Sequence, residues 1–377
     1  MSLAATAPQR VGWTWPFVCS RCGRPYPSER LTYRCPACDG LYDLASPIRY
    51  APGATPRNPA LGISHYQVMS LPRGSEWVSL GEGSTPLVGF ELEGRKSYFK
   101  CEHLNPTGSF KDRGSAVIVS ALAASGVGAA VEDSSGNAGA SFAAYAARAG
   151  IAARVFVPEY ASGPKQAQIA LYGADVVRVP GPRSAASQAV AKEVEAGAIY
   201  ASHVYLPFVL AGTATVAFEI VEQLGAPPGS VIVPVGQGTL LLGLERGFQA
   251  MLAAGAIDRL PYLVGVQAAA CAPLWAGQSG KGPGSRGLQE GETIAEGIRI
   301  LHPARGDAVL QAVEGTRGMV VAVEEDEIRA GRQALAKMGF NVEPTSAVVW
   351  PAFQTLCAEL RDPIVAVLTG SGYKTPW

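Results

Sequence analysis

The chain has 377 residues, 31 basic and 31 acidic side chains with zero formal net charge, and an apolar share of 48%. This length allows two or three domains of about 100–200 residues each, with a sizeable buried core. The balanced charge argues against an extended positively charged surface that binds nucleic acid or an anionic membrane. No stretch reaches the roughly 18 uncharged apolar residues of a membrane-spanning helix, and the first ten residues lack the apolar core of a secretory signal. We therefore expect a cytoplasmic protein.

Four of the seven cysteines lie close together near the N-terminus. Cys19 and Cys22 form one Cys-x-x-Cys pair, and Cys35 and Cys38 form a second pair twelve residues later. Two such pairs can close a tetrahedral Cys₄ site, and four protein ligands make the metal structural rather than catalytic. One alternative is four unligated thiols. The other is disulfides, which are disfavoured in a cytoplasmic chain. The spacing predicts a structural zinc ion in a small zinc ribbon.

The rest of the chain alternates between strand-like and helix-like segments after a Pro/Gly/Asn-rich stretch at 51–64. The predicted strands are 153–158, 174–179, 230–235, 262–267 and 363–370, and the predicted helices are 138–149, 164–172, 184–196 and one that ends near 254. This alternation predicts an α/β fold with parallel sheets and helices on both faces. Ligands of such sheets bind beyond the carboxyl ends of the strands, where loops lead into helices. The segments 131–139, 233–240 and 365–372 have that form.

Lys111 lies in the segment Asn-Pro-Thr-Gly-Ser-Phe-Lys-Asp-Arg-Gly, residues 105–114. By spacing alone, this is an exposed lysine at the start of a helix. A catalytic role requires an amine that loses its proton and forms an imine with an aldehyde, which lysine does when it is partly desolvated or near other cations.

The whole segment resembles the lysine motif of the fold-type II pyridoxal-phosphate (PLP) enzymes, in particular the threonine synthases. The resemblance extends from Leu-Gly-Glu-Gly-Ser-Thr-Pro-Leu at 80–87 to Leu-Thr-Gly-Ser-Gly-Tyr-Lys at 368–374. It implies the tryptophan synthase β-like fold, with Lys111 holding PLP as a Schiff base. The lysine amine, once displaced by substrate, is then the natural general base for the Cα proton.

The segment Ser-Ser-Gly-Asn-Ala-Gly, residues 134–139, is by itself a turn that caps a helix. Hydroxyls and backbone N–H groups at a helix N-terminus also suit a carboxylate. In the resembled family this loop holds the substrate carboxylate. The resemblance assigns that contact to Ser134, Ser135, Gly136 and Ala138, and it places Asn137 beside the phenolic oxygen of the cofactor.

A third segment combines Gly236, Gln237, Gly238 and Thr239 between a strand and a helix. Such a turn is often only structural, but its N–H donors can form a nest for a phosphate dianion. The resemblance makes it the phosphate-binding loop, although Gln237 departs from the glycines or Gly-Asn usual there. It also implies that a hydroxyl after the last strand hydrogen-bonds the pyridine nitrogen. Thr369 is the first choice and Ser371 the second.

The resemblance implies a PLP-dependent lyase that converts O-phosphohomoserine to threonine and phosphate. Such a reaction needs a second anion pocket, for which Arg113, Lys165 and Arg299 are the available cations, unless they are solvated or structural charges. The loop at 134–139 departs from the Ser-Thr-Gly-Asn-Thr usual in threonine synthases. That departure keeps open a serine/threonine ammonia-lyase, a diaminopropionate ammonia-lyase or a β-replacement synthase. A catalytically silent PLP-binding protein is disfavoured by the intact lysine, and a nucleic-acid-binding ribbon by the few cations in 17–44.

The domain prediction follows from these motifs. We expect a tail and zinc ribbon at 1–50, a linker at 51–75, a large PLP domain at 76–114 and 223–377, and a small α/β domain at 115–222. The resemblance further implies a homodimer with a small amino-acid substrate, and neither a nucleic-acid nor a membrane partner.

Overall fold

The structure is a computed structural model and describes residues 14–51, 59–92, 94–159, 163–181, 183–280 and 290–375. The chain divides into two compact units: unit 1 comprises 1–83 and 111–212, and unit 2 comprises 84–110 and 213–377. These boundaries differ from the predicted ones, which assigned the start of the helix at 111 to the large domain. The helix lies in unit 1 because it packs along the following helix and Ser120 accepts a hydrogen bond from Val78 N. Part of the predicted linker, 52–58, and the first 13 residues lie outside the described residues.

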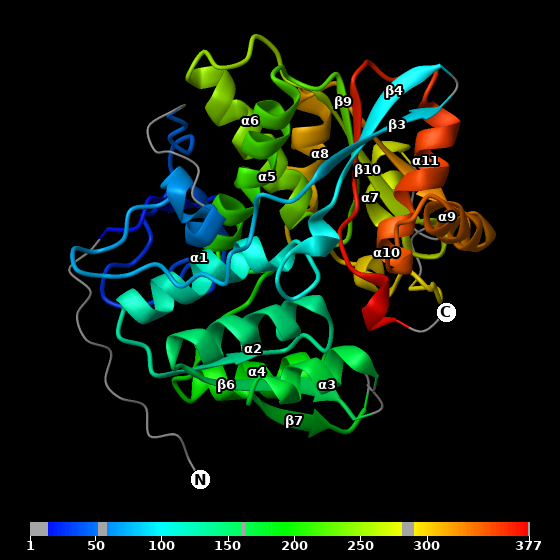
Figure 1. Ribbon diagram of the computed structural model, residues 1–377. Helices are drawn as coiled ribbons and strands as arrows, with labels where there is room; N and C mark the ends of the chain where they lie inside the picture. Colours follow the sequence, from blue (N-terminus) through cyan, green and yellow to red (C-terminus); the bar gives the residue numbers. More distant parts are fainter. Residues whose placement is uncertain are drawn as a thin grey trace. The chain divides into compact units, whose positions relative to one another are not determined.

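The helices and strands are distributed along the whole described chain (Figure 1). The α-helices are α1 (Lys111–Ala124), α2 (Asn137–Ala149), α3 (Pro164–Leu171), α4 (Arg183–Glu195), α5 (Phe208–Leu224), α6 (Thr239–Ala253), α7 (Pro273–Gln278), α8 (Gly306–Gly315), α9 (Glu325–Lys337), α10 (Pro344–Ala347) and α11 (Val349–Leu356). The strands are β1 (Phe17–Cys19), β2 (Tyr42–Leu44), β3 (Leu87–Leu92), β4 (Arg95–Lys100), β5 (Ala129–Glu132), β6 (Ala152–Pro158), β7 (Asp175–Val179), β8 (Ile199–Tyr200), β9 (Ser230–Pro234), β10 (Tyr262–Ala268), β11 (Met319–Val323) and β12 (Ile364–Val367). Short 3-10 helices are η1 (Pro59–Tyr66), η2 (Glu102–Leu104), η3 (Ala269–Cys271), η4 (Glu296–Ile298) and η5 (Gly372–Lys374).

Unit 1 contains a four-stranded parallel sheet in the order β7-β6-β5-β8. Helices α2 and α4 both pack against β6, which is drawn in green in Figure 1. Helices α2, α3 and α4 begin and end within one residue of the predicted helices, so those predictions are confirmed. Strands β1 and β2 form a separate antiparallel pair that brackets the cysteine-rich segment.

Unit 2 contains a six-stranded sheet in the order β11-β10-β9-β12-β4-β3. Strands β9 and β12 are buried at every residue, as expected for strands covered on both faces. The predicted parallel pairing is confirmed for β11, β10, β9, β12 and β4. The edge strand β3 instead pairs antiparallel with β4. Only two residues separate β3 from β4, which is too few for a parallel crossover.

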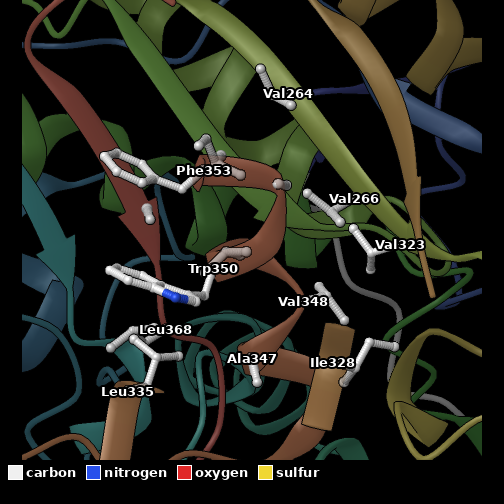
Figure 2. Packing of buried hydrophobic residues seen from close by; sticks show 14 of the residues in the cluster. Val264, Val266, Val323, Ile328, Leu335, Ala347, Val348, Trp350, Phe353 and Leu368 are labelled. Carbon is white, nitrogen blue, oxygen red and sulfur yellow. The ribbon is translucent and has the colours of Figure 1, made fainter. Parts of the chain in front are cut away.

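An apolar core of unit 2 lies between its sheet and the C-terminal helices. Figure 2 shows part of it, with Trp350 and Phe353 on α11 and Val264 and Val266 on β10. The Trp350 and Phe353 rings stack with centroids 6.0 Å apart. This core includes Ile232 of β9 and Ala366 of β12, the two strands that lead to the candidate segments of unit 2. Among the described residues, no helix is long and apolar enough to span a membrane.

Candidate active site

Lys111 is the first residue of α1 and is half-buried. The first turn of this helix packs closely against the start of α5 and the segment before it. A Cβ atom on Gly114 would lie 2.6 Å from Val209 Cγ2 and 2.9 Å from His203 Cε1. Only glycine fits such an approach, so the residue three positions after the lysine determines how closely α1 packs. The lysine is thereby presented on a rigid helix start rather than on a free loop.

A chain of buried polar side chains lies next to Lys111. Ser141 on α2 donates to Asp112 Oδ1 at 2.6 Å and lies 2.7 Å from Ser115 Oγ, which lies 2.8 Å from His203 Nε2. Burial, and then the positive charge of Lys111, hold the pKa of His203 well below its ordinary value of 6.5. His203 is therefore uncharged at neutral pH.

The predicted carboxylate loop connects β5 to α2. Gly136 N donates to Ser134 Oγ at 3.2 Å, and Gln166 on α3 donates to Ser135 O at 2.5 Å. A Cβ on Gly139 would lie 1.9 Å from Ser134 O, so the loop folds tightly over the start of α2. In the described chain, no side chain caps α2 at Gly136. The helix start thus offers the N–H end of its dipole to an anion.

The predicted phosphate loop connects β9 to the 15-residue helix α6. Gly238 precedes the helix with φ 85°, and a Cβ there would lie 2.2 Å from Val309 Cγ2. A Cβ on Gly236 would lie 3.0 Å from Gly297 O. Glycine is therefore required at 238 and favoured by close packing at 236, which leaves the backbone N–H groups of the turn accessible as a nest would need. The turn accommodates Gln237 between the two glycines. The side-chain oxygen of Gln237 accepts a hydrogen bond from Ala304 N at 3.0 Å.

Thr369 follows β12 and is buried. Its Oγ1 lies 2.9 Å from Ser346 Oγ, and Ser346 also accepts from Gly370 N at 2.8 Å. Sequence reasoning missed Ser346, which lies 23 residues before Thr369 without a local signal. Ser371, the second choice, instead accepts from Tyr373 N at the start of η5. Thr369 and the phosphate loop follow neighbouring parallel strands, so they leave the sheet at the same edge.

The four predicted metal ligands gather in one cluster. The Sγ atoms of Cys19, Cys22, Cys35 and Cys38 all lie within 4.8 Å of one another. Two of the separations are 3.5 Å, for Cys19 and Cys38, and 3.7 Å, for Cys22 and Cys35. Zinc–sulfur bonds of about 2.3 Å in a tetrahedron require sulfur atoms roughly 3.8 Å apart. The donor set therefore fits a tetrahedral zinc ion.

The three candidate cations for a second anion pocket differ in their surroundings. Arg113 has no exposed surface, and its carbonyl oxygen would lie 2.0 Å from a Cβ on Gly212. Arg299 donates to Glu290 O at 3.2 Å. Lys165, on the first turn of α3, is partly exposed. Arg113 is therefore fully buried, whereas Arg299 and Lys165 are partly exposed, and the sequence alone did not distinguish these cases.

Comparison with known proteins identifies the family to which this chain belongs. Residues 78–370 match the model of the family described as "Pyridoxal-phosphate dependent enzyme". The match spans most of the chain and includes both α1 and the loops before α2 and α6. The chain belongs to this family of PLP-dependent enzymes.

Within the family, the chain is a threonine synthase-like lyase. It is 35% identical to the threonine synthase of Methanocaldococcus jannaschii, covering 95% of this chain and 92% of the relative. It is 36% identical to the threonine synthase of Mycobacterium leprae, covering 81% and 86%. Among solved structures, the threonine deaminase from T.th. superposes with a TM-score of 0.66 at 27% identity, covering 78% of this chain and 94% of that chain. Maize serine racemase, at 23% identity and a TM-score of 0.65 over 76% of this chain and 88% of that chain, shows the shared α/β fold.

Proposed function

We propose that this protein converts O-phosphohomoserine to threonine and phosphate with bound PLP. The observation that carries the proposal is the similarity to threonine synthases over 95% of the chain. The described loops agree with it, because each predicted ligand-binding segment leads from a parallel strand into a helix N-terminus or a buried hydroxyl.

The residues present fit the cofactor. The turn at Gly236, Gln237, Gly238 and Thr239 would bind the phosphate, since positive φ and the lack of Cβ atoms leave room for N–H donors at the start of α6. Lys111 would hold the aldehyde carbon, Asn137 the phenolic oxygen, and Thr369 the pyridine nitrogen. The cofactor supplies the electron sink for the carbanion at the substrate Cα.

The protein's own part in the reaction is binding and proton transfer. Ser134, Ser135, Gly136 and Ala138 would bind the substrate carboxylate at the start of α2, where the helix dipole favours negative charge. The amine of Lys111 would take the Cα proton once the substrate has displaced it. Neutral His203 adds no positive charge beside that amine. An uncharged neighbour lets the lysine accept a proton more readily than a cation would.

A second candidate is a serine/threonine ammonia-lyase. It is favoured by the superposition with threonine deaminase and by the Ser-Ser-Gly-Asn-Ala loop. It requires no second anion pocket. Diaminopropionate ammonia-lyase and β-replacement synthase activities would use the same loop and lysine.

We further propose that Cys19, Cys22, Cys35 and Cys38 bind a structural zinc ion, because their Sγ separations fit a tetrahedral site. The predicted domain assignment and a homodimer remain proposals of the same kind. Light scattering on the purified protein tests the dimer, and a mass of one chain would contradict it.

The test of function is turnover of the PLP-loaded protein with four substrates side by side: O-phosphohomoserine, L-threonine, L-serine and L-2,3-diaminopropionate. Threonine formed with an equal amount of phosphate is the expected result. A 2-oxo acid and ammonia from the other three, with O-phosphohomoserine inert, would instead establish an ammonia-lyase.

The assignment of Lys111 has its own control. Lys111→Ala should abolish both turnover and the imine absorption band of the bound cofactor. Lys96→Ala, which removes an exposed lysine of β4, should change neither. Survival of the band in Lys111→Ala would overturn the assignment.

A further inference from the structure

The segment between the two cysteine pairs packs into the core of unit 1. The ring of Tyr33 meets the ring of Tyr200 edge-on, with centroids 5.3 Å apart at 70°, and the ring of Tyr205 at 5.6 Å and 68°. The guanidinium of Arg34 lies 4.9 Å from the Tyr205 centroid. Tyr33 thereby joins the buried cluster that includes Val131 of β5. The cysteine-rich module, residues 14–44, is anchored to the sheet that carries the predicted carboxylate loop.

Tyr200 is the last residue of β8 and reaches the start of that loop. Its hydroxyl donates to Asp133 Oδ1 at 2.7 Å, and Ser187 on α4 donates to Asp133 Oδ2. Burial, followed by the charge of Asp133, raises the pKa of Tyr200 well above its ordinary value of 10. The phenol therefore keeps its proton and remains a donor. Both oxygens of the Asp133 carboxylate are held by partners far away in the sequence.

Asp133 is the residue immediately before Ser134. Holding its carboxylate therefore sets the direction in which the chain leaves β5 and enters the loop. The next anchor is Gln166, which donates to Ser135 O at 2.5 Å. The loop is thus held on two sides, and α4, β8 and the cysteine-rich module provide the support on the Asp133 side.

We propose that Tyr200 is a positioning residue for substrate binding, and that the cysteine-rich module supports it through Tyr33. The aromatic contact holds the Tyr200 ring, the Tyr200 hydroxyl holds Asp133, and Asp133 orients the hydroxyls and N–H groups of Ser134–Ala138 toward a carboxylate. This inference rests on the proposed carboxylate-binding role of that loop. It gives the module a function in binding an amino acid without any contact between the module and the substrate.

The test compares Tyr200→Phe and Tyr33→Leu with Tyr172→Phe in the PLP-loaded protein. Tyr172→Phe is the matched control, since it removes a phenol whose hydrogen bond, from Gln168 of α3 at 3.0 Å, does not involve Asp133. Hydrogen–deuterium exchange of the peptide covering 131–142 should be faster in the first two variants and unchanged in the control. The KM for the best substrate should rise ~3- to 10-fold, as loss of one hydrogen bond predicts, with a smaller change in kcat.

A conservative pair of variants separates positioning from folding. Asp133→Asn keeps a polar group for Tyr200 and Ser187 and should retain most of the wild-type exchange protection, while Asp133→Ala should lose it. Unchanged exchange at 131–142 in Tyr200→Phe would overturn the inference. If exchange rises but no amino acid is turned over by the wild type, the positioning stands and the proposed reaction fails. Equal changes in Tyr172→Phe would reduce the effect to a general loss of stability and also overturn the inference.

Discussion

Lys100 and Glu219 form a buried ion pair in unit 2, with Lys100 Nζ 2.6 Å from Glu219 Oε2. Lys100 is the last residue of β4, and its amine also donates to Thr85 O at 2.8 Å and to Gln223 at 3.0 Å. Glu219 accepts a further bond from Ser84 N at 2.8 Å. The pair thus ties α5 to the first residues of unit 2 and satisfies both charges.

Removing one partner of this pair should be costly. Lys100→Met leaves the carboxylate of Glu219 buried without its cation, which typically costs ~3–5 kcal/mol. Thermal and urea unfolding should both show a large loss of stability. Asp175→Asn is the control, because the Asp175 carboxylate paired with Arg154 is 65% exposed and the pair should contribute at most ~1 kcal/mol. Similar losses in the two variants would contradict the structural role of the buried pair.

The phosphate loop can be tested through backbone conformation. Gly238→Ala places a Cβ against Val309 in a residue with φ 85° and should greatly reduce the affinity for PLP. Gly255→Ala, just after α6, is matched for strain, since its φ is 67° and no atom lies within 4 Å of the added Cβ. Both carry a strain of ~1 kcal/mol or more, but only Gly238→Ala should lose the cofactor on dialysis, as measured by absorbance. If Gly238→Ala and Gly255→Ala retained the cofactor equally, the turn at Gly238 would not be part of the phosphate site.

The metal proposal predicts about one zinc ion per chain by elemental analysis, as a Cys₄ site holds. Cys22→Ser should lose the metal and lower the melting temperature, because structural zinc contributes directly to folding. Cys357→Ser, which changes a buried cysteine outside the cluster, should keep the metal. A metal-free wild type purified without chelator would contradict a structural zinc ion.

Glu132, next to Asp133, should make stability depend on pH. Burial, and then the charge of Asp133, raise the pKa of its carboxyl well above the ordinary value of 4.5. Above pH 4.5 the unfolded chain releases this proton and the folded chain keeps it, so the stability contributed by the group falls as pH rises. Glu132→Gln lacks this loss. The free energy of unfolding of Glu132→Gln should equal that of the wild type near pH 4. From pH 4.5 upward, the variant should exceed the wild type by a difference that grows by at most ~1.4 kcal/mol per pH unit.

Thermal unfolding of wild type and Glu132→Gln across pH 4–8 measures this difference. Glu159→Gln, at the end of β6, is an exposed control and should follow the wild type. If the stability of Glu132→Gln relative to the wild type fell between pH 4.5 and pH 7, the carboxyl of Glu132 would be ionised in the folded protein.

Local sequence was enough to predict secondary structure and to mark each candidate segment. Helices α2, α3 and α4 follow from periodicity and from the turns that bound them, and these signals lie within a few residues of the helix ends. Sequence resemblance also placed Lys111 and the loops before α2 and α6. Each of these features depends on residues close together in the chain, where backbone preference and side-chain period act directly.

The residues that support those segments could be identified only in the folded chain. Tyr200 lies 67 residues after Asp133, and Glu219 lies 119 residues after Lys100. The strand order, the antiparallel edge at β3 and the partnership of Ser346 with Thr369 are of the same kind. Such pairs form because burial demands a partner for each polar group, and any of several distant donors could satisfy that demand. Which donor does so depends on how the strands and helices pack, and local sequence does not encode that choice.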